Sequence, residues 1–503
     1  MQNKLATWAT EDRERKFDRL LRLMASESWL QEAARVTLSS KGAHTPGIDG
    51  MTKQQMEENL FERLAEIRAQ LLEGTYQPLP AKRVYIPKAN GKHRPLGVPA
   101  LRDRIVQRAM LMVMDPIWES DFHNSSYGFR PERSVHHAIR TVKLQLQDGT
   151  HAVGRWIIEG DLCSYFERVH HKLLMKSIRK RIRDKRFLAL LWQFMKAGHI
   201  DKGLFRAASE GVPQGGVLSP LLSNIMLNEF DQWLEAKYLN KKARKDRWAW
   251  NHGIQIQRPI AIAENRQWLP AVAYCRYADD FILIVKGNKA HAESIREECR
   301  VFLEEELKLA LNMQKTNITH VNDGFIFLGH RIIRKRGPRG TMRPVTTIPR
   351  DKFRNFAAKI VEELSSHYDA NKIDLVESLN RKLLGWAAFY QFTDFTATMF
   401  GRLDRILFWK LGHWLARKYR TTIKQQIKLW VKRPANGMAK TWVLYGRSGN
   451  GQLCGIALKR LVSSPKRQFR WRNPAMNPYA KLDSKRNTIT SRYHNVAMAM
   501  SRS

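Results

Sequence analysis

The sequence has few cysteines, a shortage of acidic residues and no long hydrophobic run. Its four cysteines, Cys163, Cys275, Cys299 and Cys454, lie far apart without C-x-x-C spacing, so neither a disulfide framework nor a zinc module is indicated. The apolar stretches are short and interrupted by charge, whereas a membrane-spanning helix needs about 20 apolar residues. The charged start of the chain does not resemble a signal peptide. We therefore expect no membrane partner and a cytoplasmic or nucleoid location.

The shortage of acids leaves a large positive charge. Asp and Glu number 47 against 87 Lys and Arg, which gives a formal charge of +40 and a pI near 10.3. Such an excess implies a polyanionic partner, and nucleic acid is favoured over a membrane surface. At about 100–200 residues per domain, 503 residues suggest two to four domains.

The charge is concentrated in the last fifth of the chain. Residues 401–503 contain 23 Lys or Arg and two acids. We interpret this part as a polyanion-binding segment, and its five tryptophans indicate that much of it packs, because disordered segments are poor in aromatics. The sequence loses periodicity past Tyr479, where the chain is expected to fray.

Two stretches near the N-terminus show clear secondary-structure patterns. Apolar residues recur at helical spacing over residues 53–73, and Gly74 follows them as a C-terminal stop, which predicts one helix. Residues 83–99 have strand formers on both sides of Asn90-Gly91, a strong signal for a β-hairpin. The hairpin is basic, which suits either a solvated face or a clamp for phosphates.

Two further segments place polar residues next to predicted elements. A hydrophobic strand at 156–158 is expected to end at Asp161, and a helix to begin near His170. Taken alone, such an acid is more often a helix cap or an ion-pair partner. The stretch 211–216 is likewise compatible with a simple loop before an apolar helix over 217–234.

The stretch 273–286 sets Asp279 and Asp280 side by side among strand-forming residues. A strand-turn-strand interpretation puts them, with Tyr277, in the tight turn of an antiparallel hairpin. Two carboxylates about 4 Å apart repel each other unless a cation lies between them and a third acid. Mg²⁺, with hard oxygen ligands and room for substrate phosphates, meets this need. An exposed acidic turn is the alternative, but the apolar run that follows implies burial.

Seven motifs occur in order along the chain. They are IPKANGKHRPLGVP (86–99), SYGFRPERS (126–134), DLCSYF (161–166), GVPQGGVLSPLLSNI (211–225), RYADDF (276–281), LNMQKT (311–316) and FLGH (327–330). In this order they resemble the reverse transcriptases encoded by group II introns, the intron maturases. The resemblance runs from about residue 45 to at least Tyr390. YADD alone is a weak signal, but the seven motifs in order are highly specific.

The resemblance implies an α+β fold, a right-hand polymerase followed by a helical domain. Fingers and palm are expected over residues 1–350, the α-helical thumb or maturase domain X over 351–430, and a basic DNA-binding segment over 431–503. Three amphipathic helical patterns in 351–430 independently predict a helical bundle. Residues 235–272 form a basic insertion, either a loop or an added RNA contact. The Cys-rich HNH endonuclease that many relatives append has no counterpart in this sequence, so we expect a form without it.

The resemblance also assigns roles to single residues. Asp161, Asp279 and Asp280 are the expected catalytic acids, and together with Leu162 they are the expected ligands of two Mg²⁺ ions, for which Mn²⁺ is expected to substitute. One ion would activate the primer 3′-hydroxyl and the other would hold the triphosphate. The residues expected to bind the incoming dNTP are Lys88, Arg94, Phe166, Gln214 and Lys315. Those expected to contact primer or template are Tyr277, Gly329 and Arg130.

Phe166 is expected to select deoxynucleotides. It lies five residues after Asp161, where polymerases of this family place the residue beneath the incoming sugar. An aromatic ring there leaves no space for a 2′-hydroxyl. The alternative is a core phenylalanine next to Tyr165, and the sequence has SYF where the family often has a small residue or Cys before the Phe.

The resemblance thus implies an RNA-directed DNA polymerase that copies intron RNA and, as a maturase, promotes splicing and intron mobility. The expected partners are group II intron RNA, target DNA, an RNA template with a DNA primer, and dNTPs, and the sequence leaves open whether the chain forms a homodimer. Two other interpretations stay open. One is an RNA-binding splicing cofactor with a vestigial polymerase, and the other is a free-standing reverse transcriptase recruited to another role.

Overall fold

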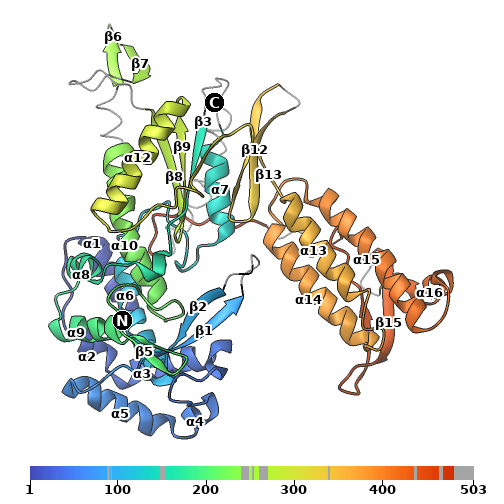
Figure 1. Ribbon diagram of the computed structural model, residues 1–503, viewed down its shortest axis with the longest axis horizontal. Helices are drawn as coiled ribbons and strands as arrows, with labels where there is room; N and C mark the ends of the chain where they lie inside the picture. Colours follow the sequence, from blue (N-terminus) through green and yellow to red (C-terminus); the bar gives the residue numbers. More distant parts are fainter. Residues whose placement is uncertain are drawn as a thin grey trace. The chain divides into compact units, whose positions relative to one another are not determined.

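The chain forms two compact units (Figure 1). The computed structural model describes residues 1–87, 91, 93–147, 155–239, 248–251, 254–259, 270–337, 340–434, 439–463 and 468–480. The first unit comprises Met1–Gln145, Val153–His320 and Arg472–Ser503, and the second comprises Leu146–Ala152 and Val321–Trp471.

The N-terminal part of the first unit is helical. Its helices are α1 (Gln2–Glu11), α2 (Leu20–Met24), α3 (Glu27–Leu38), α4 (Lys53–Glu58), α5 (Leu60–Glu73), α6 (Leu101–Trp118) and α7 (Val135–Gln145). The prediction of a single helix over 53–73 is wrong in one respect, because the structure has two helices there. Asn59 leaves helical geometry, with φ −126° and ψ 42°, and separates α4 from α5. Gly74 ends α5 in the left-handed conformation, as expected.

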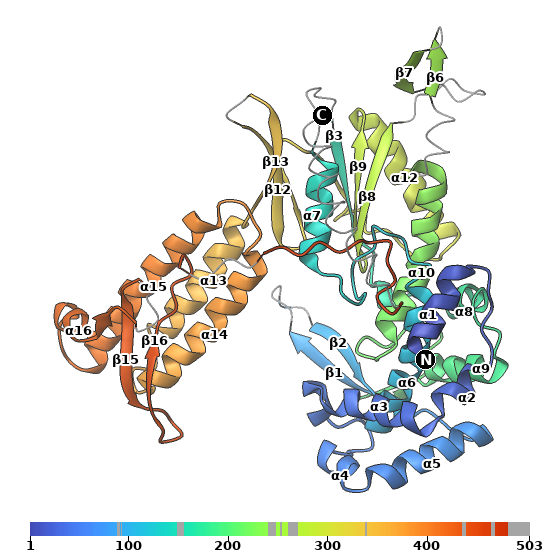
Figure 2. The same ribbon diagram turned by 180° about the vertical axis from the view of Figure 1, so that it is seen from behind.

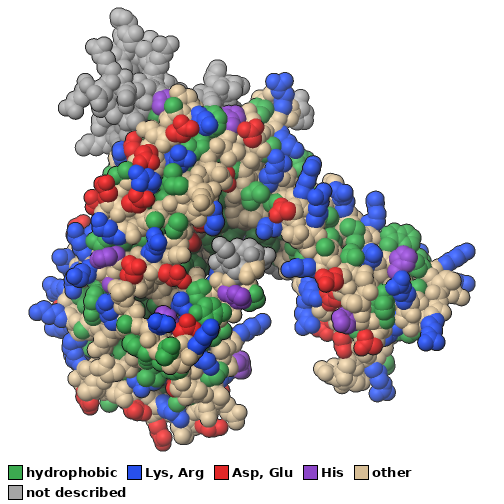
Figure 3. Space-filling model, in the orientation of Figure 1, with side chains coloured by type: hydrophobic (Ala, Val, Ile, Leu, Met, Phe, Trp, Pro, Cys, Tyr) green, Lys and Arg blue, Asp and Glu red, His purple; other side chains and the backbone are tan. Residues whose placement is uncertain are grey.

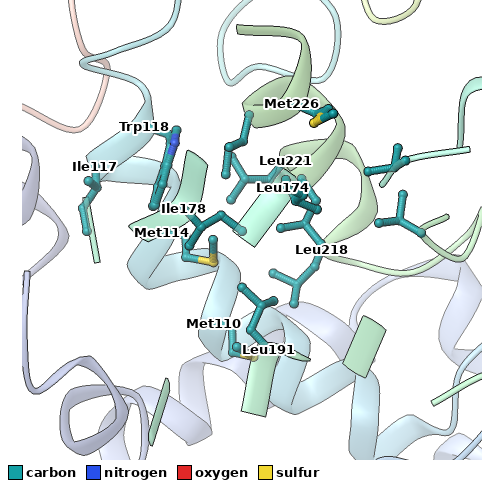
Figure 4. Close-up of a cluster of buried hydrophobic side chains, with 14 of the residues drawn as sticks. Met110, Met114, Ile117, Trp118, Leu174, Ile178, Leu191, Leu218, Leu221 and Met226 are labelled. Carbon is teal, nitrogen blue, oxygen red and sulfur yellow. The ribbon is translucent and has the colours of Figure 1, made fainter. Parts of the chain in front are cut away.

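Helix α6 lies at the centre of the core of the first unit. Figure 4 shows Met110, Met114 and Trp118 of α6 among leucines and isoleucines from three other segments. Those segments contain α8 (His171–Arg179), α9 (Lys185–Lys196) and α10 (Ser219–Leu234). The apolar side chains labelled there are all nearly or fully buried, so their burial is the main stabilisation of this unit.

A four-stranded antiparallel sheet carries the acidic motifs. Its order is β10-β3-β9-β8, with β3 (Arg155–Gly160), β8 (Ala271–Tyr277), β9 (Asp280–Lys286) and β10 (Asn317–His320). The predicted turn is confirmed, because Tyr277 pairs with Asp280 across the β8–β9 hairpin. Strand β9 is central, and Phe281 to Val285 are all buried. Helix α12 (Lys289–Glu305) contacts β3 and β10, and α7 contacts β8.

A second sheet of the first unit has the order β2-β1-β4-β5. Its strands are β1 (Ala81–Pro87), β2 (His93–Val98), β4 (His199–Asp201) and β5 (Leu204–Arg206). The basic hairpin predicted around Asn90-Gly91 is confirmed, since β1 and β2 pair antiparallel from Pro87 and His93 outward. Lys88, Asn90 and Lys92 at its tip lie outside the described residues.

The last part of the chain returns to the first unit at the end of α6. Asn477 Nδ2 donates to the Pro116 carbonyl at 2.8 Å, and the Tyr479 hydroxyl donates to Asp115 Oδ2 at 2.6 Å. Pro116 has no N–H, so the Met112 carbonyl one turn earlier lacks its helical partner, and Gln2 Nε2 donates to it instead at 2.9 Å. Both ends of the chain therefore complete the hydrogen bonding of one helix end.

The second unit begins with a three-stranded sheet and continues as helices. The strands are β11 (Phe325–Phe327), β12 (His330–Arg336) and β13 (Met342–Thr347), and the helices are α13 (Arg350–Glu363), α14 (Lys372–Tyr390), α15 (Thr396–Lys418) and α16 (Ile423–Trp430). The helical bundle predicted over 351–430 is confirmed. The second compact unit itself begins near 320, because the β11–β13 sheet bonds to it through Thr346 and Asp394. The domain boundary expected at 350 stays a prediction.

The basic remainder adds a second small sheet to the second unit, of β14 (Val431–Lys432), β15 (Thr441–Arg447) and β16 (Leu453–Ala457) (Figure 2). As expected from its tryptophans, this segment packs. Trp442 is fully buried and donates its indole N–H to the Phe408 carbonyl at 2.9 Å. The segment from 431 does not stay in one unit, however, because the chain from Arg472 belongs to the first.

The structure describes only parts of the basic insertion at 235–272 and of the C-terminal stretch past Tyr479. Of the basic insertion at 235–272, the structure describes the π-helix Glu235–Leu239, the strands β6 (Trp248–Asn251) and β7 (Ile254–Pro259), and the chain from 270. Its predicted RNA contact, like the predicted fraying past Tyr479, falls largely outside the described residues. Across the described ranges, we find no helix with the length and apolar character needed to span a membrane.

A fully buried ion pair joins the acidic hairpin to the helical core. Arg276 of β8 donates from Nε to Asp231 Oδ1 of α10 at 2.8 Å and from Nη2 to Oδ2 at 2.5 Å, and neither side chain is exposed. The Tyr274 hydroxyl also donates to Asp231, at 2.6 Å. Burial opposes the charge on Arg276, but the carboxylate of Asp231 raises the pKa of the guanidinium above its usual value. The pair is therefore charged and bidentate.

The ion pair also holds the turn itself. Arg276 Nη1 donates to the Ala278 carbonyl at 3.0 Å, and to Asn224 Oδ1 of α10 at the same distance. One side chain thus bonds two positions on α10 and the backbone of the residue before Asp279.

We expect Asp231→Ala to destabilise the first unit by about 3–5 kcal/mol, because it leaves a buried guanidinium without its counter-ion. The measurement is urea unfolding followed by amide hydrogen exchange in β8 and β9. A double variant, Asp231→Leu with Arg276→Met, removes both charges and should recover most of the loss. Equal stability of wild type and Asp231→Ala would contradict the assigned role.

Candidate active site

The first acid stands at the end of β3. Gly160 precedes it and pairs with Phe281 of β9, whose ring would lie 2.2 Å from a Cβ atom at position 160. Only glycine allows this close approach. Asp161 follows directly and is partly exposed. Its carbonyl accepts from Asn312 N at 2.8 Å, and its Oδ2 accepts from Asn312 Nδ2 at 3.2 Å and from Lys315 Nζ at 2.9 Å.

The second and third acids lie in the β8–β9 turn. Ala278 adopts φ +57°, a left-handed conformation uncommon for a residue other than glycine, aspartate or asparagine. The SYGFRP loop packs tightly on this backbone, since a Cβ atom at Gly128 would lie 2.2 Å from Ala278 N. Asn224 Nδ2 donates to the Gly128 carbonyl at 2.8 Å and so bonds the loop to α10.

The three acids act on one another electrostatically. Burial, followed by the repulsion from Asp279 and then Asp161, raises the pKa of Asp280 to about 6. Burial and then Asp161 likewise raise the pKa of Asp279, against the nearby charges of Arg94 and Arg276. The strand register has therefore brought Asp161 close enough to the turn for its charge to raise the pKa values of Asp279 and Asp280.

This donor set fits a hard divalent cation in its chemistry. All three groups are carboxylates that repel one another, and a bound cation would remove that repulsion. In the part of the chain that the structure describes, no three His, Cys, Asp or Glu side chains converge closely enough to hold a metal ion as they stand. The ammonium of Lys315 is the cation beside Asp161 here. Leu162 is buried and bridges to Leu311, so that it offers only its backbone.

Phe166 and Tyr165 have different surroundings. Tyr165 is buried, and its hydroxyl donates to the Ser223 carbonyl at 2.7 Å, so it is the core residue of the pair. Phe166 is partly exposed and lines a pocket of about 320 Å³. The ring of Phe129 meets it edge-on, with 6.4 Å between centroids. Phe129 itself is 53% exposed with φ +59°, and sequence patterns gave no sign of this contact.

The glycine-rich loop lies against strand β2 of the basic hairpin. The Gln214 carbonyl accepts from Gly97 N at 2.7 Å. Gly215 has φ +112°, and a Cβ atom there would lie 2.6 Å from the Gly97 carbonyl oxygen. Arg94 lies on the same strand, is exposed, and its charge reaches Asp279. Arg94 therefore lies within electrostatic reach of the acids, and Gln214 bonds to the same strand, whereas Lys88 falls outside the described residues.

The three residues expected to contact primer or template differ in their exposure and in the unit to which they belong. Tyr277 is partly exposed at the end of β8, next to the acids. Gly329 belongs to the second unit, in the turn between β11 and β12 with φ +75°, where its carbonyl accepts from the Tyr390 hydroxyl at 3.2 Å.

Arg130 is buried, and its expected contact with primer or template stays a prediction. Its side chain is 1% exposed, pairs with Glu119 at 2.9 Å, and donates to the carbonyls of His123 and Ser126. These bonds use its guanidinium to hold the loop after α6. Sequence reasoning also missed Asn312, although it lies inside the LNMQKT motif, next to residues that were singled out.

Comparison with known proteins places these observations in a family. The model of the reverse transcriptase (RNA-dependent DNA polymerase) family matches residues 86–332, and that of the group II intron maturase-specific domain matches residues 353–438.

The chain is also similar to named relatives. Protein YkfC of Escherichia coli K12 is 70% identical over 360 residues, covering 72% of this chain and 94% of that protein. The group II intron-encoded protein LtrA of Lactococcus lactis subsp. cremoris is 33% identical over 357 residues, covering 64% of this chain and 58% of LtrA. The putative COX1/OXI3 intron 2 protein of Saccharomyces cerevisiae is 30% identical, and 39% of its length is covered. The chain belongs to the RNA-directed DNA polymerases with a maturase domain that group II introns encode.

Proposed function

We propose that the chain copies RNA into DNA at Asp161, Asp279 and Asp280, and that it binds group II intron RNA to promote splicing and mobility. The observation that carries the first part is the β3–β9 register, which sets Asp161 beside the Asp279-Asp280 turn at one end of a buried sheet. All three acids are present on an intact scaffold, which disfavours a vestigial polymerase.

The three acids would hold two Mg²⁺ ions, with Mn²⁺ able to replace them. When bound, the metal would lower the pKa of the primer 3′-hydroxyl and neutralise charge on the triphosphate. The chain's own cations would position the substrate. Arg94 is exposed within electrostatic reach of Asp279, and Lys315 is 69% exposed while it bonds Asp161. Both can turn to the phosphates of a dNTP without loss of a buried contact.

Phe166 would act as the sugar gate. Its neighbour Tyr165 is fully buried, whereas the ring of Phe166 packs at the edge of the core and stays partly exposed. It is held from two sides, by the ring of Phe129 and by the bond from Val212 N to its own carbonyl at 2.7 Å. A ring fixed in this way five residues after a metal-binding acid would exclude a ribose 2′-hydroxyl.

Intron RNA and target DNA are proposed as partners from the charge and from the second unit. Figure 3 shows Lys and Arg side chains over much of the face in view. The net charge of +40 supplies phosphate contacts without sequence specificity. The maturase-domain match and the intron origin of LtrA suggest which RNA is bound.

The first prediction concerns the acids. Asp279→Asn should lower primer extension on an RNA template by at least about two orders of magnitude, because the amide cannot bind the metal as a carboxylate does. Binding of the primer–template should stay within a few-fold of wild type. Glu305→Ala, an exposed acid on α12 of the same unit, is the control and should extend primers normally. Substantial extension by Asp279→Asn would disprove the site.

The second prediction concerns sugar choice. Phe166→Ala should raise rNTP incorporation relative to dNTP at least about tenfold, equivalent to about 1.4 kcal/mol in the transition state, since it opens space beneath the sugar. Single-nucleotide incorporation kinetics measure the ratio. Tyr165→Phe keeps the neighbouring ring but loses its bond to Ser223, and it should leave the ratio unchanged. Unaltered discrimination in Phe166→Ala would assign the gate to another residue.

The third prediction separates splicing from polymerisation. Binding and steadying folded RNA needs the basic surface but not the acids. Asp279→Asn should therefore accelerate splicing of the intron RNA that flanks the gene as well as wild type does, and the effect should weaken with salt for both. Splicing time courses at two salt concentrations test this. If wild type extends primers but accelerates no flanking intron, the chain is a free-standing reverse transcriptase.

A further inference from the structure

A groove in the second unit has no part in the polymerase chemistry. It has a volume of about 720 Å³ and lies between α15 and the segments around β15 and β16. Both α15 and β15 are labelled in Figure 1. Five basic residues are among those that line it, namely Arg402, Arg405, Lys440, Lys459 and Arg460. The first three are exposed.

Its lining residues include a single acid, which is already used. Asp404 is 8% exposed, and its two carboxylate oxygens accept from Leu461 N at 2.9 Å and Val462 N at 3.1 Å. The carboxylate thereby holds the chain after β16 against α15. The groove consequently presents a strong excess of positive charge, which an anionic ligand would complement.

The remaining lining is mostly apolar and includes the exposed indole of Trp409. Leu407 and Leu458 are buried beneath the groove, while Trp409 is 49% exposed. The Phe408 ring meets Trp409 edge-on, with centroids 5.4 Å apart, and so supports it from the side. An exposed aromatic face among arginines is the arrangement on which unpaired bases stack.

We propose that this groove binds single-stranded nucleic acid, with an unpaired base stacked on Trp409 and its phosphates bound by Arg402, Arg405 and Lys440. Its volume suits a nucleotide rather than a helix. A duplex hides the faces of its bases and would use only the cations, and an acidic peptide would leave the indole without a flat partner. The site lies on the second unit and rests on the nucleic-acid binding proposed above, to which it adds the form of the ligand, an unpaired strand, and the residues that bind it.

The test is fluorescence anisotropy of a labelled 12-nucleotide single strand, as RNA and as DNA, on the full-length protein. An excess of unlabelled blunt RNA–DNA duplex keeps the polymerase cleft occupied. We expect Trp409→Ala to raise the Kd at least about fivefold, because stacking on the indole is lost, and Trp409→Phe to restore most of the affinity. Arg405→Gln should lower the salt slope of log K by roughly 0.7, the value for one phosphate contact on a single strand.

Matched controls make the outcome decisive. Tyr445→Ala removes a 54% exposed aromatic of β15 that does not line the groove, and it should bind like wild type. Melting curves and primer extension with Trp409→Ala should also equal wild type. The ratio of RNA to DNA affinity identifies which strand the groove prefers. Wild-type affinity in Trp409→Ala, an equal loss in Tyr445→Ala, or equally effective competition by a polyglutamate peptide would overturn the proposal.

Discussion

The bidentate bond between Arg276 and Asp231 is the constraint on which the geometry of the acidic turn depends. Removing two charges from water is costly, and the cost is offset only if every donor and acceptor finds a partner. Here the guanidinium bonds Asp231, Asn224 and the Ala278 carbonyl, while Tyr274 completes the carboxylate. Because these bonds are directional, strand β8 has only one position relative to α10. The position of β8 in turn fixes the position of the turn that carries Asp279.

The acids themselves do not stabilise this arrangement. Asp279 and Asp280 are partly desolvated, and each has a raised pKa because of burial and its neighbours. Such a cluster would drift apart on an exposed hairpin, but here the turn is bonded to α10 and covered by the SYGFRP loop at Gly128. The scaffold holds together carboxylates whose mutual repulsion opposes folding. A cation that binds between them would relieve this repulsion. Stability and function thus reside in different residues of one small region.

The features that sequence patterns predicted are those set by neighbours in the chain. The β8–β9 hairpin, the basic hairpin and the helices from α13 to α15 follow from periodicity and turn residues, which act locally. Arg130 lies in a motif, yet its role depended on Glu119 and two carbonyls that only the fold brings near. The partnership of Arg276 with Asp231 was equally hidden, since a buried arginine has no signature in composition. The start of the second compact unit near 320 also reflects packing of a sheet that no local pattern assigns.

The chain completes the first unit only after it has passed through the second, because the residues from Arg472 onward belong to the first. The first unit uses Asn477 and Tyr479, which follow the whole second unit in sequence, to complete the end of α6. That end adjoins Glu119, the partner of Arg130, and so the loop whose Gly128 covers the catalytic turn. During synthesis, the first unit therefore lacks these bonds until the second has been made. A chain shortened within the maturase domain would lose a support of its polymerase core as well as its RNA-binding surface, so the fold couples the presence of both.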